Sequence, residues 1–384
     1  TDQGRMEEVL AEAYDNLLDK ALERDHTLDL QYQGLSHLEL SQLEVKFTEE
    51  VVWEVIKEVP PDRAPGPNGF IGLFYHKAWP VIKKDIMAAL LKLFVGDYRG
   101  FGRLNKAHLV LIPKKTGAIE VGDYRPISLP HSFSKLFSKM LANRARRRMR
   151  EIVSINQSAF IKGRNIHDNY LLVHQVARKI HGTKQSDLFL KLDISRAFDS
   201  LSWPFLFEVL RQYDFGDRFL EWLAILLSSA STKVLLNGNP GPPIWHRQGL
   251  RQGDPVLPLL FAIAIDTLNS LLQHASRAGM LQRLTNRHTA SSISLFADDV
   301  VIFCHPTRSE LATTRELLRV FGDASDLRTN YLKCSATPIR CGHEVINTIN
   351  STIGCASRQL PHRVPGSSPD HPQDPLFGFA SSGG

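Results

Sequence analysis

Two adjacent aspartates, Asp298 and Asp299, interrupt the most β-prone stretch of this 384-residue chain. They separate Ile293-Ser294-Leu295-Phe296 from Val300-Val301-Ile302-Phe303, two runs rich in apolar and β-branched residues. The pattern predicts a β-hairpin with two carboxylates at its tip. Carboxylates beside a buried hairpin are costly unless they are paired or bind a cation, so a divalent metal ion would stabilise them. An ordinary solvated turn is the alternative that the dipeptide leaves open.

A third carboxylate, Asp193, ends another apolar stretch, residues 187–193, which we expect to be a strand. If the two strands are neighbours in one sheet, Asp193 can face Asp298. Such a group suits phosphoryl transfer by two Mg²⁺ ions roughly 3.5–4 Å apart, because Mg²⁺ prefers oxygen ligands and keeps several waters. We therefore predict Asp193, Asp298 and Asp299 as catalytic and metal-binding residues, with Asp299 the most peripheral and Mn²⁺ as an alternative ion.

Charge is distributed unevenly along the chain. Residues 1–58 contain five Lys or Arg and fifteen Asp or Glu, whereas the rest contains 41 and 25. Apolar residues recur at helical spacing in the first part, so we expect an acidic helical N-terminal extension. The basic remainder predicts a polyanionic partner, since each neutralised phosphate releases counterions. For its densest basic run, residues 144–150, a solvated helix face is the alternative.

The rest of the chain mixes strand and helix patterns, which predicts an α+β fold. We expect residues 109–112 and 124–129 to form a hairpin that carries Lys114 and Lys115 near its tip and Arg125 on its flank. Helices are expected over 134–151, 203–229 and 255–278, and a strand over 232–239.

Several protein classes are excluded by composition. No apolar run approaches the roughly 18 residues of a membrane span, and the polar, acidic start is not a signal peptide. Because the chain starts without Met, we expect a fragment of a longer product. Its four cysteines lack metal-site spacing and are expected to be reduced thiols of an intracellular protein, nuclear or cytoplasmic. These are Cys304, Cys334, Cys341 and Cys355.

Three segments resemble the palm motifs of reverse transcriptases: residues 191–199 (KLDISRAFD), 249–255 (GLRQGDP) and 296–299 (FADD). Four further elements are similar to those of LINE-type (non-LTR) retrotransposons, in a plant-like form, and they follow the family's order. The polymerases of group II introns fit less well, because the Ala-Pro-Gly-Pro element and the spacing are LINE-like. The four elements are residues 64–70, 111–114, 124–128 and 157–164.

The resemblance implies a right-hand polymerase with fingers over 59–185 and an antiparallel palm sheet over 186–345, into which finger segments are inserted. It implies RNA-directed DNA synthesis, that is, nucleotidyl transfer to a primer 3′-hydroxyl. The expected partners are an RNA template, a DNA primer and dNTPs. The sequence carries no signal for an oligomeric state, and nothing in it resembles an endonuclease.

The resemblance also assigns roles to individual residues. Phe198 holds the steric-gate position that excludes a ribose 2′-hydroxyl, with core packing as the alternative. Lys333 could protonate the leaving pyrophosphate, although it could equally be an ordinary surface lysine. The remaining nucleotide-binding residues are Lys114, Lys115, Arg125, Gln252 and Gly253, and the template-binding residues are Gln157, Arg164 and Asn165.

Departures from the family pattern concentrate near the C-terminus. Asp326 stands where a glycine is expected, which would strain a turn. Residues 346–384 end in a Pro/Ser/Gly-rich stretch instead of the primer grip and thumb. A shift by one base after Arg363 restores the family motif, so we expect 364–384 to be out of frame and the thumb to be truncated. The second hypothesis is therefore a non-catalytic remnant that at most binds nucleic acid.

Overall fold

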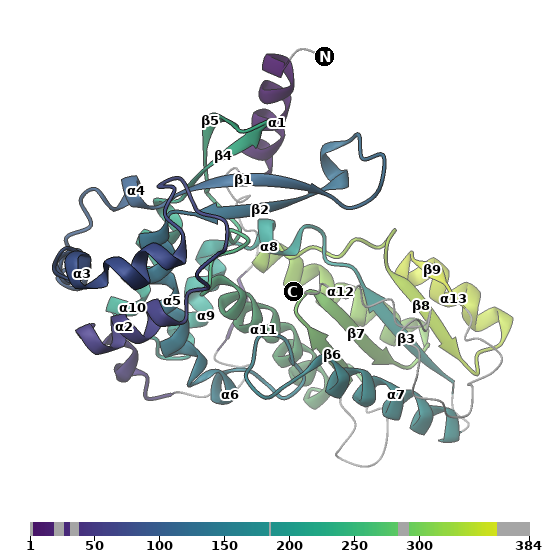
Figure 1. Ribbon diagram of the computed structural model, residues 1–384. Helices are drawn as coiled ribbons and strands as arrows, with labels where there is room; N and C mark the ends of the chain where they lie inside the picture. The colour runs from purple at the N-terminus through teal and green to yellow at the C-terminus, as the bar shows by residue number, and fades with distance from the viewer. Residues whose placement is uncertain (1–2, 19–26, 31–37, 184–185, 283–291, 359–384) are drawn as a thin grey trace.

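The computed structural model describes residues 3–18, 27–30, 38–183, 186–282 and 292–358. The fold is α+β, as predicted, with a four-stranded sheet and a five-stranded sheet at opposite sides of a helical centre (Figure 1). The tail that we expect to be out of frame, residues 364–384, lies outside the described residues.

The four-stranded sheet has the order β2-β1-β4-β5. Strands β1 (Lys106–Pro113) and β2 (Tyr124–Pro130) pair antiparallel, which confirms the hairpin predicted for residues 109–112 and 124–129. The short helix η2 (Val121–Asp123) lies in their connection. β4 (Ser231–Leu236) pairs parallel to β1 and antiparallel to β5 (Asn239–Trp245). The β4–β5 segment, which begins about 100 residues after the end of β2, thus completes the sheet.

The N-terminal segment is an integral part of the fold rather than a loose extension. Helix α1 (Gln3–Leu18) buries Leu10, Tyr14 and Leu18 against the four-stranded sheet. Helix α2 (Glu49–Lys57) begins after Thr48, whose hydroxyl accepts a hydrogen bond from the N–H of Val51. The 3₁₀ helix η1 (Ser41–Glu44) packs nearby, and these two elements contribute to the largest apolar core.

The basic run at 144–150 fastens this N-terminal segment, a role that neither predicted alternative described. The Arg144 guanidinium donates to the carbonyl oxygens of Leu43 (2.8 Å) and Val45 (2.6 Å). Arg148 donates to the carbonyl oxygen of Glu39 at 2.8 Å. The helix predicted over 134–151 is in fact two helices, α5 (Ser132–Arg146) and α6 (Met149–Ile152).

Other helices surround the centre. They are α3 (Gly72–Phe94), α4 (Phe101–Leu104), α8 (Ala197–Ser200), α9 (Trp203–Gln212) and α10 (Asp217–Ser228). The pattern over 203–229 therefore corresponds to two helices, α9 and α10. Within the described ranges, no helix is long and apolar enough to cross a membrane.

The five-stranded sheet has the order β6-β7-β3-β8-β9. Its strands are β3 (Asp187–Leu192), β6 (Ile293–Phe296), β7 (Asp299–Cys304), β8 (Ser335–Ile339) and β9 (Ala356–Ser357). The predicted antiparallel pairing holds for every pair except β8 and β9, which are parallel. All four cysteines are free thiols, as expected.

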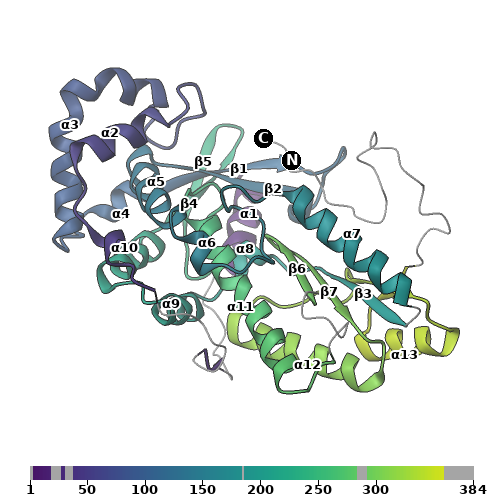
Figure 2. The same cartoon turned by 90° about the horizontal axis from the view of Figure 1, so that it is seen from below.

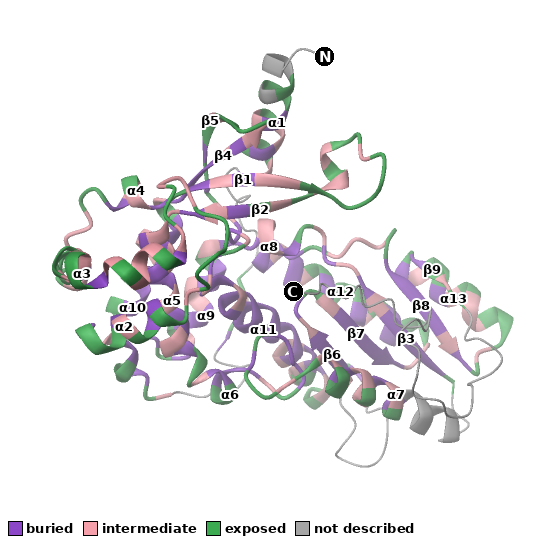
Figure 3. Ribbon diagram, in the orientation of Figure 1, coloured by how far each residue is buried: buried purple, intermediate pink, exposed green. Residues whose placement is uncertain are grey.

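Both faces of the five-stranded sheet are covered. Helix α7 (Ile166–Thr183) packs on one face, where Val173 and Val176 contact Phe189 (Figure 2). Leu188 and Leu190 alternate to the opposite face and join the core that contains α11 (Leu257–Arg277) and α12 (Arg308–Ser325). Helix α13 (His343–Ile353) leads to β9. The strands are consequently buried almost throughout (Figure 3).

Candidate active site

The five-stranded sheet brings the three predicted catalytic aspartates to one end of two neighbouring strands. β3 and β7 pair antiparallel, and the last pair in their register joins Leu192 to Val300. Asp193 follows β3 directly and Asp299 begins β7, so the two lie side by side at this end. Asp298 occupies the turn between β6 and β7 and is exposed. The predicted hairpin of Asp298 and Asp299 is confirmed, and so is the pairing of the Asp193 strand with this hairpin.

Repulsion among these carboxylates is visible in the electrostatics of Asp298. Partial burial raises the pKa of its carboxyl, and the nearby charges of Asp299 and Asp193 raise it further. Lys191 acts in the opposite direction, and its Nζ lies 3.5 Å from Oδ1 of Asp299. The site thus gathers more negative charge than the neighbouring lysine offsets.

The turn that carries Asp298 has a strained backbone, which the side chain of Gln157 holds by a hydrogen bond. Ala297 adopts a φ of 53°, in the left-handed region that is unfavourable for residues other than glycine. Its N–H donates to Oε1 of Gln157 at 3.2 Å, and the same oxygen accepts the N–H of Ala159 at 2.8 Å. Gln157 is 0% exposed. Its side chain therefore lies under the turn, and a template contact would require a different position.

Arg164 is likewise occupied within the protein. Its guanidinium donates to the carbonyl oxygens of Gln157 (2.7 Å) and Val153 (3.3 Å), and also to that of Ser154. Burial lowers the pKa of this guanidinium. Asn165, the third predicted template residue, is exposed. Of the three, Asn165 faces solvent, whereas Gln157 contacts the Ala297 turn and Arg164 holds the 153–157 loop.

The loop containing Gln252 and Gly253 packs tightly between β2 and α8. Gly253 has a φ of 99°, and a Cβ atom there would lie 2.6 Å from the carbonyl oxygen of Ser128 in β2. A glycine is therefore required both by conformation and by space. The N–H of Ser128 donates to the carbonyl oxygen of Gln252 at 3.3 Å, and Nε2 of Gln252 donates to Asp199 at 3.4 Å. Burial raises the pKa of Asp199 to about 6.

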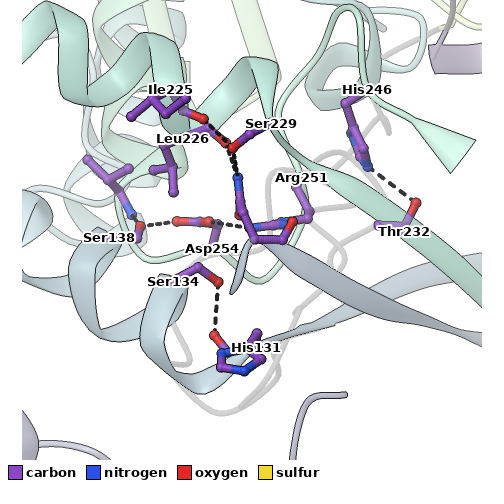
Figure 4. Close-up of polar contacts among 12 residues, drawn as sticks. His131, Ser134, Ser138, Ile225, Leu226, Ser229, Thr232, His246, Arg251 and Asp254 are labelled. Carbon is purple, nitrogen blue, oxygen red and sulfur yellow. Dashed lines mark hydrogen bonds and ion pairs between the residues drawn. The ribbon is translucent and has the colours of Figure 1, made fainter. Parts of the chain in front are cut away.

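A buried polar cluster fixes this loop from behind, and the sequence reasoning did not identify it. Asp254 accepts a short hydrogen bond from the Ser138 hydroxyl and one at 3.1 Å from the Arg251 guanidinium (Figure 4). The guanidinium also donates to Oδ1 of Asn105 at 2.8 Å. Arg251 and Asp254 are 4% and 1% exposed. The only sequence signal was two opposite charges three residues apart beside apolar helix residues.

Phe198 lies at the junction of the loop and the sheet. It is half-buried and stacks on Phe261 of α11, with ring centroids 4.3 Å apart, and its edge contacts Phe160. The N–H of Leu250 donates to its carbonyl oxygen at 2.6 Å. A rigidly stacked ring suits a steric gate, and the same contacts agree with core packing.

The predicted phosphate-binding cations lie on the β1–β2 hairpin. Lys115 forms an ion pair with Asp123 (2.7 Å), and Nζ of Lys114 donates to the carbonyl oxygen of Gly122 (2.9 Å). Lys114 is close enough to Asp199 to lower its pKa, which links the hairpin to the Gln252 loop. Arg125 is exposed. Of the three cations, Lys114 is the one whose charge acts on the Gln252 loop, through Asp199.

Lys333 belongs to the loop that contacts the backbone of Asp193. It is exposed, at the end of a loop in which the N–H of Asn330 donates to the carbonyl oxygen of Asp193 at 2.8 Å. The N–H of Asp193 in turn donates to the sulfur of Cys334 at 3.3 Å. The backbone of Asp193 is thus held from the loop that carries Lys333.

Comparison with known proteins shows the family of this chain. A sequence model of the family described as "Reverse transcriptase (RNA-dependent DNA polymerase)" matches residues 112–350, a span that includes every predicted site residue. The chain belongs to the reverse transcriptase family. It is a LINE-type reverse transcriptase domain, an RNA-directed DNA polymerase by ancestry.

Two relatives show how much of a larger protein this domain represents. The transposon TX1 uncharacterized 149 kDa protein of Xenopus laevis is 28% identical over 294 residues, which cover 77% of this chain and 22% of that protein. The Pol polyprotein from the type-2 retrotransposable element R2DM of Drosophila melanogaster is 28% identical over 302 residues, which cover 76% of this chain and 27% of that protein. The chain thus spans about a quarter of these relatives.

Proposed function

We propose that this reverse transcriptase domain adds deoxynucleotides to the 3′-hydroxyl of a DNA primer paired with an RNA template. The observation that carries the proposal is the grouping of Asp193, Asp298 and Asp299 at one end of β3 and β7, where burial and then the charges of the other two aspartates raise the pKa of Asp298. In this reading the five-stranded sheet is the palm of a right-hand polymerase, and the β1–β2 hairpin belongs to the fingers.

We infer that Asp193, Asp298 and Asp299 would hold a pair of Mg²⁺ ions. Within the described ranges, no group of three or more His, Cys, Asp or Glu side chains is already placed to hold a metal ion by itself. An open carboxylate group nevertheless suits Mg²⁺, which usually takes one or two carboxylates and completes its shell with substrate phosphates and water. Asp193 and Asp298 would be the main ligands, because Asp299 also contacts Lys191. When bound, the ions supply activation of the primer hydroxyl and charge neutralisation at the triphosphate.

The protein's own groups then bind and orient the nucleotide. Lys114, Lys115 and Arg125 would attract the triphosphate from the β1–β2 hairpin, since Arg offers a planar fork and Lys a point charge. Asp123 and Gly122 hold the two lysines meanwhile, so binding would exchange these contacts for phosphate.

The base and the sugar would meet the loop between the two sheets. Gln252 and Gly253 would contact the nascent base pair, and the packing of their backbone against β2 would hold them in place. Phe198, fixed by its stacking on Phe261, would exclude a 2′-hydroxyl. Lys333 would protonate the leaving pyrophosphate, and Asn165 would contact the template strand.

The direct test is primer extension on an RNA template with Mg²⁺ and dNTPs. The control is the Asp298→Ala, Asp299→Ala double variant, verified as folded by circular dichroism. Extension by the unaltered chain that disappears in the control would support the proposal. Absence of extension by the folded, unaltered chain would favour the alternative, a remnant that at most binds nucleic acid. Restoring the reading frame after Arg363 would then test whether the expected shift in frame is the cause.

A further inference from the structure

Gln157 makes a set of contacts that its predicted role in template binding does not explain. The side chain is fully buried, and its Oε1 bridges two backbone N–H groups, those of Ala159 and Ala297. Ala297 is the residue directly before Asp298 in the turn. Nε2 of Gln157 has no hydrogen-bond partner. A buried amide with an unused donor is costly, so its accepting oxygen must offset that cost.

The segment around Gln157 is itself anchored to α11. The Asp266 carboxylate accepts the N–H of Ser154 at 2.8 Å, and Oδ1 of Asn269 accepts the side chain of Asn156 at 2.7 Å. From this anchor the segment runs beside the edge of β6, where Gln157 forms a parallel bridge with Leu295. The N–H of Leu295 donates to the carbonyl oxygen of Asn156 at 2.8 Å. Gln157 is therefore a rigidly held acceptor under the turn.

The backbone of the turn needs such an acceptor. A non-glycine residue in the left-handed region, such as Ala297 at 53°, persists only where its surroundings determine the conformation. Without the Gln157 oxygen, the N–H of Ala297 would be a buried donor with no partner, and the turn would gain by relaxing. Relaxation would move the peptide that carries Asp298 relative to Asp193.

We propose that Gln157 is a positioning residue, which holds the Ala297 peptide so that Asp298 presents its carboxylate toward the divalent cations. The inference rests on the proposed polymerase function. It replaces the predicted contact of Gln157 with the template by a role beneath the metal-binding turn. It also predicts that the loss of this side chain affects cation binding more than nucleotide binding.

The test compares Gln157→Met with a matched variant, Asn169→Leu. Asn169 is also a buried amide at this edge, 3% exposed, but its Nδ2 donates to the carbonyl oxygen of Leu295 and leaves the turn untouched. Mn²⁺ binding to the full chain with primer–template and dNTP would be measured by electron paramagnetic resonance. We expect Gln157→Met to weaken Mn²⁺ binding about tenfold, the scale of one lost buried hydrogen bond. Asn169→Leu should leave it within about twofold.

Kinetics and a second substitution separate positioning from general destabilisation. Gln157→Met should lower kcat and raise the Mg²⁺ concentration for half-maximal rate, with an unchanged KM for dNTP. Ala297→Gly relieves the strain at this position, so in its background Gln157→Met should weaken Mn²⁺ binding less than threefold. Equal effects of Gln157→Met and Asn169→Leu, or an undiminished effect beside Ala297→Gly, would overturn the inference. If the unaltered chain neither binds Mn²⁺ nor extends a primer, the proposed function itself fails and the inference falls with it.

Discussion

Asp254 and Asp298 both belong to motifs of the reverse transcriptase family, and both are crowded by protein, but their environments differ in kind. Asp254 is 1% exposed, and its oxygens accept from Ser138 and from the Arg251 guanidinium. Asp298 is exposed at a turn, where the nearest charges are mostly those of other aspartates. One carboxylate is neutralised inside the fold, whereas the other is surrounded by repulsion.

This difference indicates how the two residues contribute. A buried carboxylate that is paired with hydrogen-bond donors fixes the structure around it, here the loop of Gln252 and Gly253. Its removal leaves the oppositely charged partner buried without a counterion. A carboxylate that lies beside two other carboxylates is stabilised when a cation binds there. We therefore expect Asp254 to govern stability and Asp298 to govern chemistry.

The largest effect is expected for Asp298→Asn. The substitution keeps the shape of the side chain but removes a negative charge at the proposed metal site, so primer extension should fall by about 10³-fold or more. The unfolding midpoint in urea should stay equal or rise, because repulsion with Asp193 and Asp299 is relieved. A lower urea midpoint with retained primer extension would show that Asp298, like Asp254, contributes to stability rather than to chemistry.

For Asp254→Ala we expect a loss of about 3 kcal/mol in the free energy of unfolding, because Arg251 would remain buried without its carboxylate. Urea denaturation followed by tryptophan fluorescence measures this loss. Ser138→Ala, which removes one neutral partner, should cost only about 1–2 kcal/mol. Equal losses from both variants would show that the ion pair has no special weight.

Lys191→Met tests the electrostatic environment of Asp298, the active-site member of the comparison with Asp254. Lys191 lowers the pKa of Asp298 against the raising effects of burial and of the other aspartates. Without it that pKa should rise further, so the acid limb of log kcat/KM against pH should move to higher pH. The rate at neutral pH should fall by about threefold to tenfold, the effect of one partly exposed charge. Lys84→Met, at an exposed lysine of α3, should leave the profile unchanged.

The smallest effect concerns the end of α12. Asp326 caps this helix in the left-handed conformation, with a φ of 61°, where a glycine is free of strain. Asp326→Gly should therefore raise the free energy of unfolding by up to about 1 kcal/mol. Differential scanning calorimetry would detect it as a higher Tm, with the pH dependence of activity unchanged. A lower Tm would mean that the ion pair of Asp326 with Arg328, at 3.7 Å, outweighs the strain.

The sequence predicted the hairpin of Asp298 and Asp299 because local β-prone runs and a two-residue tip determine it. The pairing of β3 with β7 joins positions more than 100 residues apart, and only the order of the family motifs indicated it. The strain at Asp326 was also expected, because the family pattern has a glycine at this position, and the structure gives Asp326 a φ of 61°.

What the sequence did not predict depends on partners distant in the chain. Gln157 resembled a surface contact until the structure placed Ala297, 140 residues away, against its oxygen. Arg251 and Asp254 are charged residues in a loop, a pattern that usually indicates exposure, and their burial depends on Asn105 and Ser138. Periodicity and motif spacing carry no information about such long-range hydrogen bonds.

The most direct test of this account measures two quantities for Asp298→Asn and Asp254→Asn side by side. These are the RNA-templated extension rate per folded molecule and the urea midpoint. We predict that Asp298→Asn loses extension and keeps its midpoint, while Asp254→Asn loses stability and keeps extension per folded molecule within about tenfold. Extension that survives in Asp298→Asn, or that disappears in Asp254→Asn at an unchanged midpoint, would contradict the assignment of chemistry to one aspartate and structure to the other.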